Sequence, residues 1–470
     1  MPEELLFRED AIAETRQLAA SQSPCASAVE LTASWRALGL PAGGVVLVAM
    51  PNGAAFLKLL NAIVAANFVP AFIAPTTPAP RIRQMAEDFC ATAIVRTRIP
   101  DALSRELSLV NRIDLEAFEI GLFEPHGAPL TKPGEVVLVT SGTSSDFSSG
   151  CVHSLIALRR NGRRHAEAIG MTRSDRVLVN LPLYYSFAFV AQALAANEVG
   201  ADLVVSGPPF APSQYFSDLT EQDISITSIT PVIVRQILHG SRQCLPSCVR
   251  VLTVGGDRLS FEEADGLRTR FRGVELYLTY GLTEAGPRVS TAAAHLIPPE
   301  RWTSVGKPLS GTRVRIAPIG ENALEGELLV HSDTLLERKI GRNVEDPTVV
   351  IDGLRWLRTG DIFRVDEDGY LFFCNRKSEF IILKGEKINL RAIKNLCCGL
   401  PGVITCRTKD IEGAGGRSGY ALEILFDERT VSESGADVLA ADLLKSLKRS
   451  ERPERLTLRR VDPIALSTYK

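Results

Sequence analysis

Hydrophobic and polar residues follow an alternating pattern from about residue 30 to residue 290. Short runs of β-branched residues are separated there by longer segments in which apolar residues recur every three to four positions. The short runs predict strands at 45–50, 92–95, 135–141, 176–181, 201–206, 224–230, 249–254 and 274–280. The longer segments predict helices at 54–67, 154–170, 231–240 and 260–272. This alternation is typical of a layered α/β domain with a largely parallel sheet, which binds ligands at the carboxyl ends of its strands.

The pattern changes after about residue 300. Consecutive strands are predicted at 312–318 and 326–332, and an Asp-Gly turn at 368–369 predicts a hairpin. From Arg376 onward, strands and helices mix again over about 95 residues. We therefore expect an α/β protein with a large N-terminal body of layered α/β subdomains plus a β-subdomain (1–375) and a small, mobile α+β C-terminal domain (376–470).

Composition narrows the class of protein. With 470 residues, 45% of them hydrophobic and 23% charged, the chain can bury large cores, which excludes a mostly disordered protein. The net charge of −2 gives no reason to expect a nucleic-acid or membrane partner. Nine scattered cysteines suggest free thiols, and the acidic start lacks the layout of a signal peptide. We expect a cytoplasmic location.

The segment from Thr140 to Gly150 is rich in hydroxyl side chains and glycine, and it is predicted to lie between a strand and a helix. Backbone N–H groups and hydroxyls in such a loop suit a polyphosphate, although a loop of this composition is more often only flexible. It matches neither a Walker loop nor a dinucleotide fingerprint.

Three further positions could carry chemistry. Thr283 and Glu284 follow a predicted strand, where a hydroxyl beside a carboxylate suits a phosphate and Mg²⁺, or forms an ordinary turn. Asp361 could accept both hydroxyls of a ribose. Lys470 ends the sequence and by default would be a terminal lysine without a partner.

Taken in order, these segments resemble the motifs of the acyl-adenylate-forming enzymes, the superfamily of acyl- and aryl-CoA ligases, peptide-synthetase adenylation domains and firefly-type luciferases. The resemblance runs from about Leu38 to the last residue. It is carried by SGTSS (141–145), LPLYYSF (181–187), YGLTEAGP (280–287), SVGKPL (304–309), GELLV (326–330), RTGD (358–361), DGYLFFCNRKSEFIILKGEKI (368–388) and STYK (467–470).

The resemblance implies a two-step reaction. A carboxylate attacks the α-phosphate of MgATP to give acyl-AMP and pyrophosphate, and a thiol then displaces AMP. It also implies which residues of this sequence form the site. By this resemblance the catalytic residues are Lys470, Thr283 and Glu284, and Glu284 also holds Mg²⁺. Nucleotide binding falls to Thr140, Ser141, Gly142, Thr143, Ser144, Gly150, Gly255, Gly256, Asp257, Tyr280, Gly281, Asp361 and Arg376. Ser378 matches the position about which the small domain rotates.

The phosphate loop departs from the family pattern because it has neither the proline nor the lysine found there. Losing that cation should weaken the neutralisation of pyrophosphate. Ser378 stands where most relatives have Asp or Lys, so domain rotation and the thioester step are less secure.

By the same resemblance, the acyl pocket is lined by Tyr185, Ser186, Phe187, Ile229, Thr230, Thr279, Gly286 and Pro287. Ser186 replaces the Asp with which amino-acid-activating relatives bind an α-ammonium group, which disfavours an amino acid. The aromatic residues favour an aryl acid over a medium-chain acid. Arg288 could pair with an acidic substituent, but a surface arginine is the simpler interpretation.

The expected partners are a small carboxylic acid, ATP, Mg²⁺ and an acceptor, either CoA or a separate acyl carrier protein. Two alternatives stay open: adenylation with transfer to a non-thiol nucleophile, and a degenerate member that binds nucleotide without turnover.

Overall fold

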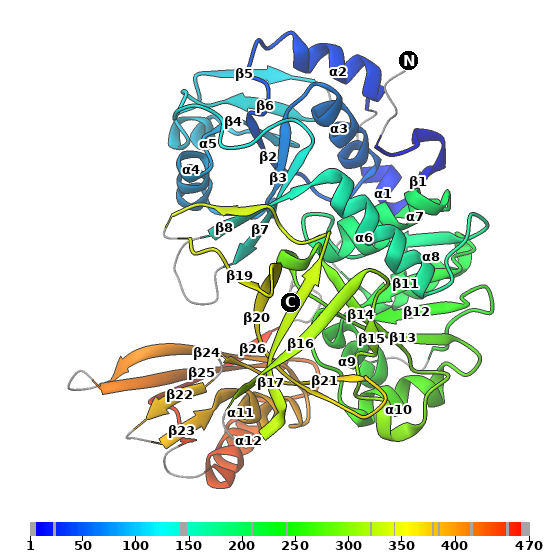
Figure 1. Cartoon of the computed structure of the whole chain (residues 1–470), viewed down its shortest axis with the longest axis vertical. Helices are drawn as coiled ribbons and strands as arrows, with labels where there is room; N and C mark the ends of the chain where they lie inside the picture. Colours follow the sequence, from blue (N-terminus) through cyan, green and yellow to red (C-terminus); the bar gives the residue numbers. More distant parts are fainter. Residues whose placement is uncertain are drawn as a thin grey trace.

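The computed structural model confirms an α/β fold with a large N-terminal body (Figure 1). It describes residues 6–21, 25–115, 117–141, 148–207, 210–240, 243–319, 322–342, 344–377, 380–383, 386–413, 417–447 and 451–461. Within these ranges the strands form two eight-stranded sheets, a five-stranded sheet and two smaller sheets. No helix in the described ranges is long and apolar enough to cross a membrane.

The first eight-stranded sheet has a parallel centre with antiparallel strands on both sides. Its strands in spatial order are β18 (Arg338–Ile340), β8 (Ser148–Ser154), β7 (Glu135–Ser141), β3 (Val69–Phe72), β2 (Val45–Ala49), β4 (Ala91–Arg96), β6 (Glu119–Leu122) and β5 (Asn111–Asp114). All five residues of β2 are buried, as expected for a parallel strand covered on both faces. The covering helices are α2 (Ala28–Arg36), α3 (Ala54–Ala65), α4 (Ala79–Asp88) and α5 (Asp101–Glu106).

The second eight-stranded sheet is parallel over its first six strands. Its spatial order is β1 (Ile12–Glu14), β10 (Asp202–Val205), β9 (Arg176–Val179), β11 (Ile226–Ile229), β12 (Val251–Val254), β13 (Glu275–Gly281), β14 (Arg288–Ala293) and β15 (Lys307–Pro308). The accompanying helices are η1 (Glu9–Ala11), α1 (Arg16–Ser21), α6 (Leu155–Ala168), η2 (Phe187–Leu194), α7 (Ala195–Val199), α8 (Pro212–Glu221), α9 (Pro231–Gly240) and α10 (Phe261–Arg270). One hydrophobic core joins the two sheets, and the rings of Phe72 and Phe189 meet within it at 4.8 Å.

A five-stranded antiparallel sheet follows in the sequence, after the short helices η3 (Thr283–Ala285) and η4 (Pro299–Arg301). It consists of β16 (Thr312–Ile319), β17 (Asn322–Ser332), β20 (Leu354–Val365), β19 (Thr348–Ile351) and β21 (Leu371–Arg376). The predicted Asp-Gly turn is confirmed: Gly369 N donates to Asp366 O at 3.0 Å between β20 and β21.

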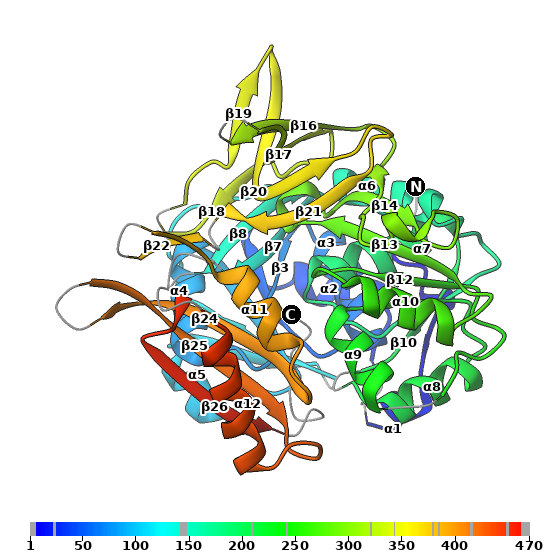
Figure 2. The ribbon, with the colours of Figure 1, turned by 90° about the horizontal axis from the view of Figure 1, so that it is seen from below.

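The C-terminal segment has a hydrophobic core of its own, centred on Ile393, Tyr420, Phe426 and Leu443. Its elements are β22 (Phe380–Leu383), β23 (Glu386–Asn389), α11 (Leu390–Cys398), β24 (Val403–Gly413), β25 (Arg417–Asp427), α12 (Glu433–Ser446) and β26 (Arg455–Val461). In both overall views this segment, coloured orange and red, lies at one end of the molecule (Figures 1 and 2). The separate core favours the predicted terminal domain, and its boundary at 375/376 stays a prediction.

The segment after the phosphate loop corrects one expectation. The loop leads into strand β8 rather than directly into a helix, so it joins two antiparallel strands. Gly150 is paired with Val139 inside this hairpin, and a Cβ there would lie 2.6 Å from Val137 Cγ1. This close packing between strands requires a residue without a side chain at position 150, and the predicted contact of Gly150 with phosphate stays a prediction.

Candidate active site

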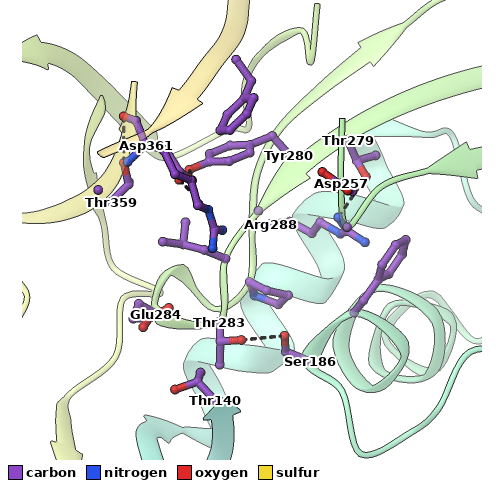
Figure 3. A pocket seen from close by; sticks show the side chains of 18 of the residues that line it. Thr140, Ser186, Asp257, Thr279, Tyr280, Thr283, Glu284, Arg288, Thr359 and Asp361 are labelled. Atoms are coloured by element: carbon purple, nitrogen blue, oxygen red, sulfur yellow. Dashed lines mark hydrogen bonds and ion pairs between the residues drawn. The ribbon is translucent and has the colours of Figure 1, made fainter. Parts of the chain in front are cut away.

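A cavity of about 1130 Å³ opens at the carboxyl ends of β11, β12 and β13, the place expected for a ligand site in a parallel sheet. It gathers most of the predicted site residues from segments far apart in the sequence (Figure 3). The predicted residues that line it are Thr140, Tyr185, Ser186, Phe187, Thr230, Gly256, Asp257, Thr279, Tyr280, Gly281, Thr283, Glu284, Pro287, Asp361 and Arg376.

Three predicted residues lie behind the cavity wall, because they support it without lining it. Ile229 is buried in β11. A Cβ on Gly255 would lie 2.3 Å from Thr279 Oγ1, and one on Gly286 would lie 2.3 Å from Thr334 O. Their predicted contacts with nucleotide or acid stay predictions. The predicted residues Gly142, Thr143, Ser144, Ser378 and Lys470 lie outside the described residues, and Ser141 is described only as part of β7.

Tyr280, Asp361 and Arg376 form a polar group on one side of the cavity, where Figure 3 shows Tyr280 beside Asp361. The Tyr280 hydroxyl donates to Asp361 Oδ2 at 2.7 Å, and Arg376 Nε lies 2.9 Å from Asp361 Oδ1. Asp361 and Arg376 are register partners on β20 and β21, so the hairpin itself brings them together. Burial and the nearby Asp361 carboxylate raise the pKa of Tyr280 well above its usual value. The phenol therefore stays protonated and donates a hydrogen bond to Asp361.

Glu284 and Lys339 form an ion pair on another wall of the cavity, with Nζ to Oε1 at 2.8 Å. Burial alone would raise the pKa of Glu284, but the ammonium of Lys339 outweighs it and lowers that pKa. Lys339 lies on β18, which pairs with β8 directly after the phosphate loop. Sequence reasoning missed Lys339, since only the pairing of two strands distant in sequence places it here.

Hydroxyl groups line the floor between these two clusters. Thr283 Oγ1 and Ser186 Oγ lie 3.2 Å apart, and Thr140 Oγ1 and Ser149 Oγ lie 2.9 Å apart. Thr283 begins η3 directly after β13, so the end of the strand sets its position. These groups can donate to or accept from an oxygen-rich ligand.

Arg288 is buried in the cavity wall, and its interpretation as a surface arginine is wrong. Its backbone is fixed by a reciprocal pair of 2.9 Å hydrogen bonds with the side chain of Asn161 on α6. Its guanidinium lies over the ring of Phe187, with Cζ 3.7 Å from the ring centroid, and Nη1 donates to Thr279 Oγ1 at 2.9 Å. Burial lowers the pKa of Arg288 to about 9, so the group still carries its charge at neutral pH.

The aromatic part of the cavity comes from the segment that leads into η2. Tyr185 and Phe187 both line the cavity, and the ring of Tyr185 contacts that of Tyr184 at 4.6 Å. The Phe187 face that meets Arg288 is not available to a substrate ring, so the aromatic lining is smaller than the sequence suggested.

The residues present fit a magnesium nucleotide. Asp361 is 1% exposed and yet lines the cavity, which places a buried carboxylate where hydroxyls can reach it. Glu284 supplies one carboxylate for a cation, and the described residues contain no cluster of three or more His, Cys, Asp or Glu side chains that could hold a metal. A single carboxylate suits Mg²⁺ that is bound largely through phosphate oxygens and water.

Comparison with known proteins agrees with this geometry. A family model described as AMP-binding enzyme matches residues 26–338. The sulfoacetate–CoA ligase of Cupriavidus necator is 27% identical over 451 residues, covering 90% of this chain and 85% of that protein. A feruloyl-CoA synthase of an Amycolatopsis species is 26% identical over 380 residues, covering 79% of this chain and 76% of that protein.

The fold is shared with solved structures. The o-succinylbenzoate CoA synthetase of Bacillus subtilis, in complex with the acyl-adenylate intermediate OSB-AMP, superposes with a TM-score of 0.73. The two chains are 18% identical, and the superposition covers 95% of this chain and 91% of the other. This likeness confirms the predicted fold class.

Proposed function

The chain belongs to the AMP-binding enzyme family, and we propose that it is an AMP-forming ligase that activates a carboxylic acid with MgATP and passes the acyl group to the thiol of CoA. The observation that carries the proposal is one cavity that joins the Tyr280–Asp361–Arg376 group to the Glu284–Lys339 pair, with Thr283 between them. The first group suits a ribose and the second suits a charged phosphate chain.

The nucleoside half of ATP would be held by the first group. Asp361 accepts from the ribose hydroxyls, and its orientation is fixed by Tyr280 and Arg376. Gly256 and Gly281 line the adjoining wall. At Gly256 the absence of a side chain would let a flat base approach the backbone, whereas a Cβ on Gly281 would lie 2.3 Å from Pro287 O, so Gly281 allows close packing of the chain.

The triphosphate of ATP would be held by hydroxyl groups of the cavity and by the Glu284–Lys339 pair. Thr283 donates to the α-phosphate, and Thr140 and Ser149 donate to the outer phosphates. Glu284 would hold Mg²⁺, which would supply neutralisation of phosphate charge. Lys339 provides a cation beside the phosphate loop, which lacks the lysine of its relatives.

In the first step a carboxylate oxygen of the acid bonds to the α-phosphorus, and the bond to the bridging oxygen of pyrophosphate breaks. Lys470 would neutralise the charge that develops on the attacking and phosphoryl oxygens, since its position in the sequence matches that of the adenylation lysine. In the second step a thiolate attacks the acyl carbon and AMP leaves. Rotation of the C-terminal segment about Ser378 would convert the arrangement for adenylation into the arrangement for thioester formation.

The acid pocket would be formed by Tyr185, Ser186, Phe187, Thr230 and Thr279. Its aromatic lining favours an aryl acid, and Ser186 leaves an α-ammonium group without a counter-ion, which disfavours an amino acid.

Acid-dependent exchange of labelled pyrophosphate into ATP tests the first step. The full chain is incubated with MgATP and a panel of aryl and aliphatic acids. We expect exchange that requires one class of acid. Nucleotide binding without exchange for any acid would instead support a degenerate member of the family.

The acceptor is tested separately, once an acid is known. CoA, a phosphopantetheinylated carrier protein and a primary amine are compared at equal concentration. We expect CoA to give a thioester at least tenfold faster than the other two acceptors. An amide as the main product would favour the non-thiol alternative.

A further inference from the structure

The buried guanidinium of Arg288 has hydrogen-bonding capacity that the described part of the chain leaves unused. Its Nη1 is bonded to Thr279, whereas Nε and Nη2 have no hydrogen-bond partner there. No ion pair with a carboxylate within 4.0 Å is found for Arg288 among the same residues. The side chain is 3% exposed, so a charged group with open donors is withdrawn from bulk solvent.

The orientation of the Arg288 guanidinium determines which of its N–H groups a ligand could bind. Phe187 covers one face of the plane, and Thr279 holds Nη1 while itself bonding to Val254 O at 3.1 Å. The edge without a hydrogen-bond partner is therefore the one formed by Nε and Nη2, and both atoms are buried. These two N–H groups point in parallel and match the two oxygens of a carboxylate.

A second buried polar group lies in the same part of the cavity. Thr230 is 5% exposed, and its hydroxyl also has no partner among the described residues. A Cβ on Gly256 would lie 3.6 Å from Thr230 Cγ2 and 3.8 Å from Phe187 Cδ1, so Thr230 shares a wall with the ring that covers Arg288. Two residues that line the pocket proposed for the acid thus carry buried donors without a partner in the described part of the chain.

We propose that the acid activated by this protein carries a second anionic group, a carboxylate or a sulfonate, which binds the Nε and Nη2 edge of Arg288 and the hydroxyl of Thr230. This inference rests on the proposed adenylation, and it names the substrate class of that same cavity. The reacting carboxylate lies toward Thr283, and the second anion lies in the wall formed by Phe187, Thr230 and Arg288. A substrate with one anionic group would leave the buried charge without a counter-ion.

The structure offers one competing role for Arg288. By bonding to Thr279 and stacking on Phe187, the side chain could serve only to hold the cavity wall in place. In that case its loss would weaken the use of every acid equally, whereas recognition of an anion predicts a selective loss.

The test uses the full chain and matched pairs of acids with the same skeleton: benzoate with the three benzene dicarboxylates and with sulfobenzoate, and butanoate with succinate and glutarate. Exchange of labelled pyrophosphate gives kcat/KM for each acid. We expect at least one doubly charged acid to exceed its singly charged partner by about 100-fold. Arg288→Met should remove that advantage, so that kcat/KM falls much further for the doubly charged acid than for its singly charged partner.

Two further variants separate recognition from loss of folding. Thr230→Val should lower kcat/KM for the doubly charged acid about tenfold, and Arg288→Lys should restore only part of the advantage because an ammonium cannot bind side-on with two parallel donors. Arg268→Met is the matched control, since Arg268 lies on α10 over Trp302 and outside the lining of the cavity.

Calorimetry without turnover measures binding of the same acids to wild type and to Arg288→Met. This measurement distinguishes failure of the anion site from failure of the proposed adenylation. Exchange that prefers singly charged acids overturns the inference and leaves adenylation standing. Equal loss for both members of each pair in Arg288→Met also overturns it. If no acid supports exchange, adenylation fails, and tighter binding of doubly charged acids that depends on Arg288 would still support the anion site.

Discussion

At the scale of single residues, Lys339 and Arg288 are two of the cations that line the cavity, and neither lies in a glycine-rich loop. Lys339 reaches the phosphate side from β18, and Arg288 reaches the acid side from the start of β14. Lys339 is placed by the pairing of two strands that are distant in sequence, whereas Arg288 directly follows the segment that carries Thr283 and Glu284. In the proposed reaction, Lys339 would lie near the phosphate chain and Arg288 near the acid.

Removing the charge of Lys339 should affect the nucleotide rather than the acid. In Lys339→Met, Glu284 loses its counter-ion, and the cavity loses a cation on the strand that pairs with β8. We expect pyrophosphate exchange to fall about 10- to 100-fold and MgATP to bind more weakly, as measured by exchange kinetics and calorimetry. Lys339→Arg should retain most activity. Lys132→Met, at an exposed lysine, is the control, and equal effects of the two methionine variants would contradict the assignment.

Lys470 tests the chemistry of the first step. Lys470→Ala should reduce acid-dependent exchange about 100-fold or more while ATP binding persists, because the ammonium acts on charge that develops in the transition state. Exchange and nucleotide affinity are measured on the same preparation. Unchanged exchange would remove Lys470 from the mechanism.

At the scale of elements, the carboxyl and amino ends of the parallel strands differ in function. Their carboxyl ends line the cavity, whereas Asp175 joins the opposite ends. Its carboxylate lies 2.6 Å from Arg250 Nη2 and accepts from Ser225 Oγ at 2.8 Å and from Thr172 N at 2.7 Å. Burial would raise its pKa, but these partners outweigh burial and lower the pKa to about 2.

Asp175→Asn should therefore lower stability and spare activity. The folded-state pKa near 2 lies below the ordinary value of 3.8, so the carboxylate contributes about 2 kcal/mol above pH 4. That contribution is lost as pH falls from about 4 through 2. Urea midpoints from pH 3 to pH 7 should converge for wild type and variant as pH falls. Asp202→Asn is the control, at an exposed residue of β10. A pH-independent difference would contradict this account.

Element periodicity explains which parts of the fold were predictable. The strands at β2, β7 and β13 and the hairpin of β20 and β21 carry strong local signals, in buried β-branched runs and an Asp-Gly turn. Strand β8 was missed because Ser148–Ser154 is mostly small and polar, and it becomes a strand by pairing with β7 and β18.

The same limit applies to the site. Thr283, Glu284 and Asp361 were found because each lies in a short motif, and the structure brings all three to one cavity. Lys339 and the buried state of Arg288 follow from sheet order and from the neighbouring helix α6, which single-sequence patterns do not encode. Gly255 and Gly286 matched motifs but support packing.

At the scale of the whole molecule, the C-terminal segment has its own core and lies beside the body (Figure 2). We propose that it moves as one unit about Ser378 between the adenylation and thioester steps. Such motion needs no rearrangement inside either core, because the described hydrophobic clusters on the two sides are separate.

Ser378→Pro tests that motion, since proline restricts rotation at its own backbone and at the preceding residue. We expect exchange within about threefold of wild type and thioester formation at least tenfold slower. Both rates are measured with the same acid. Loss of both steps together would argue against a hinge at this position.

The stoichiometry of products tests the central claim most directly. With MgATP, CoA and an acid that supports exchange, the full chain should release one AMP and one pyrophosphate for each acyl-CoA formed, as measured by chromatography and mass spectrometry. Formation of ADP and phosphate, or hydrolysis of ATP that does not depend on the acid, would contradict it.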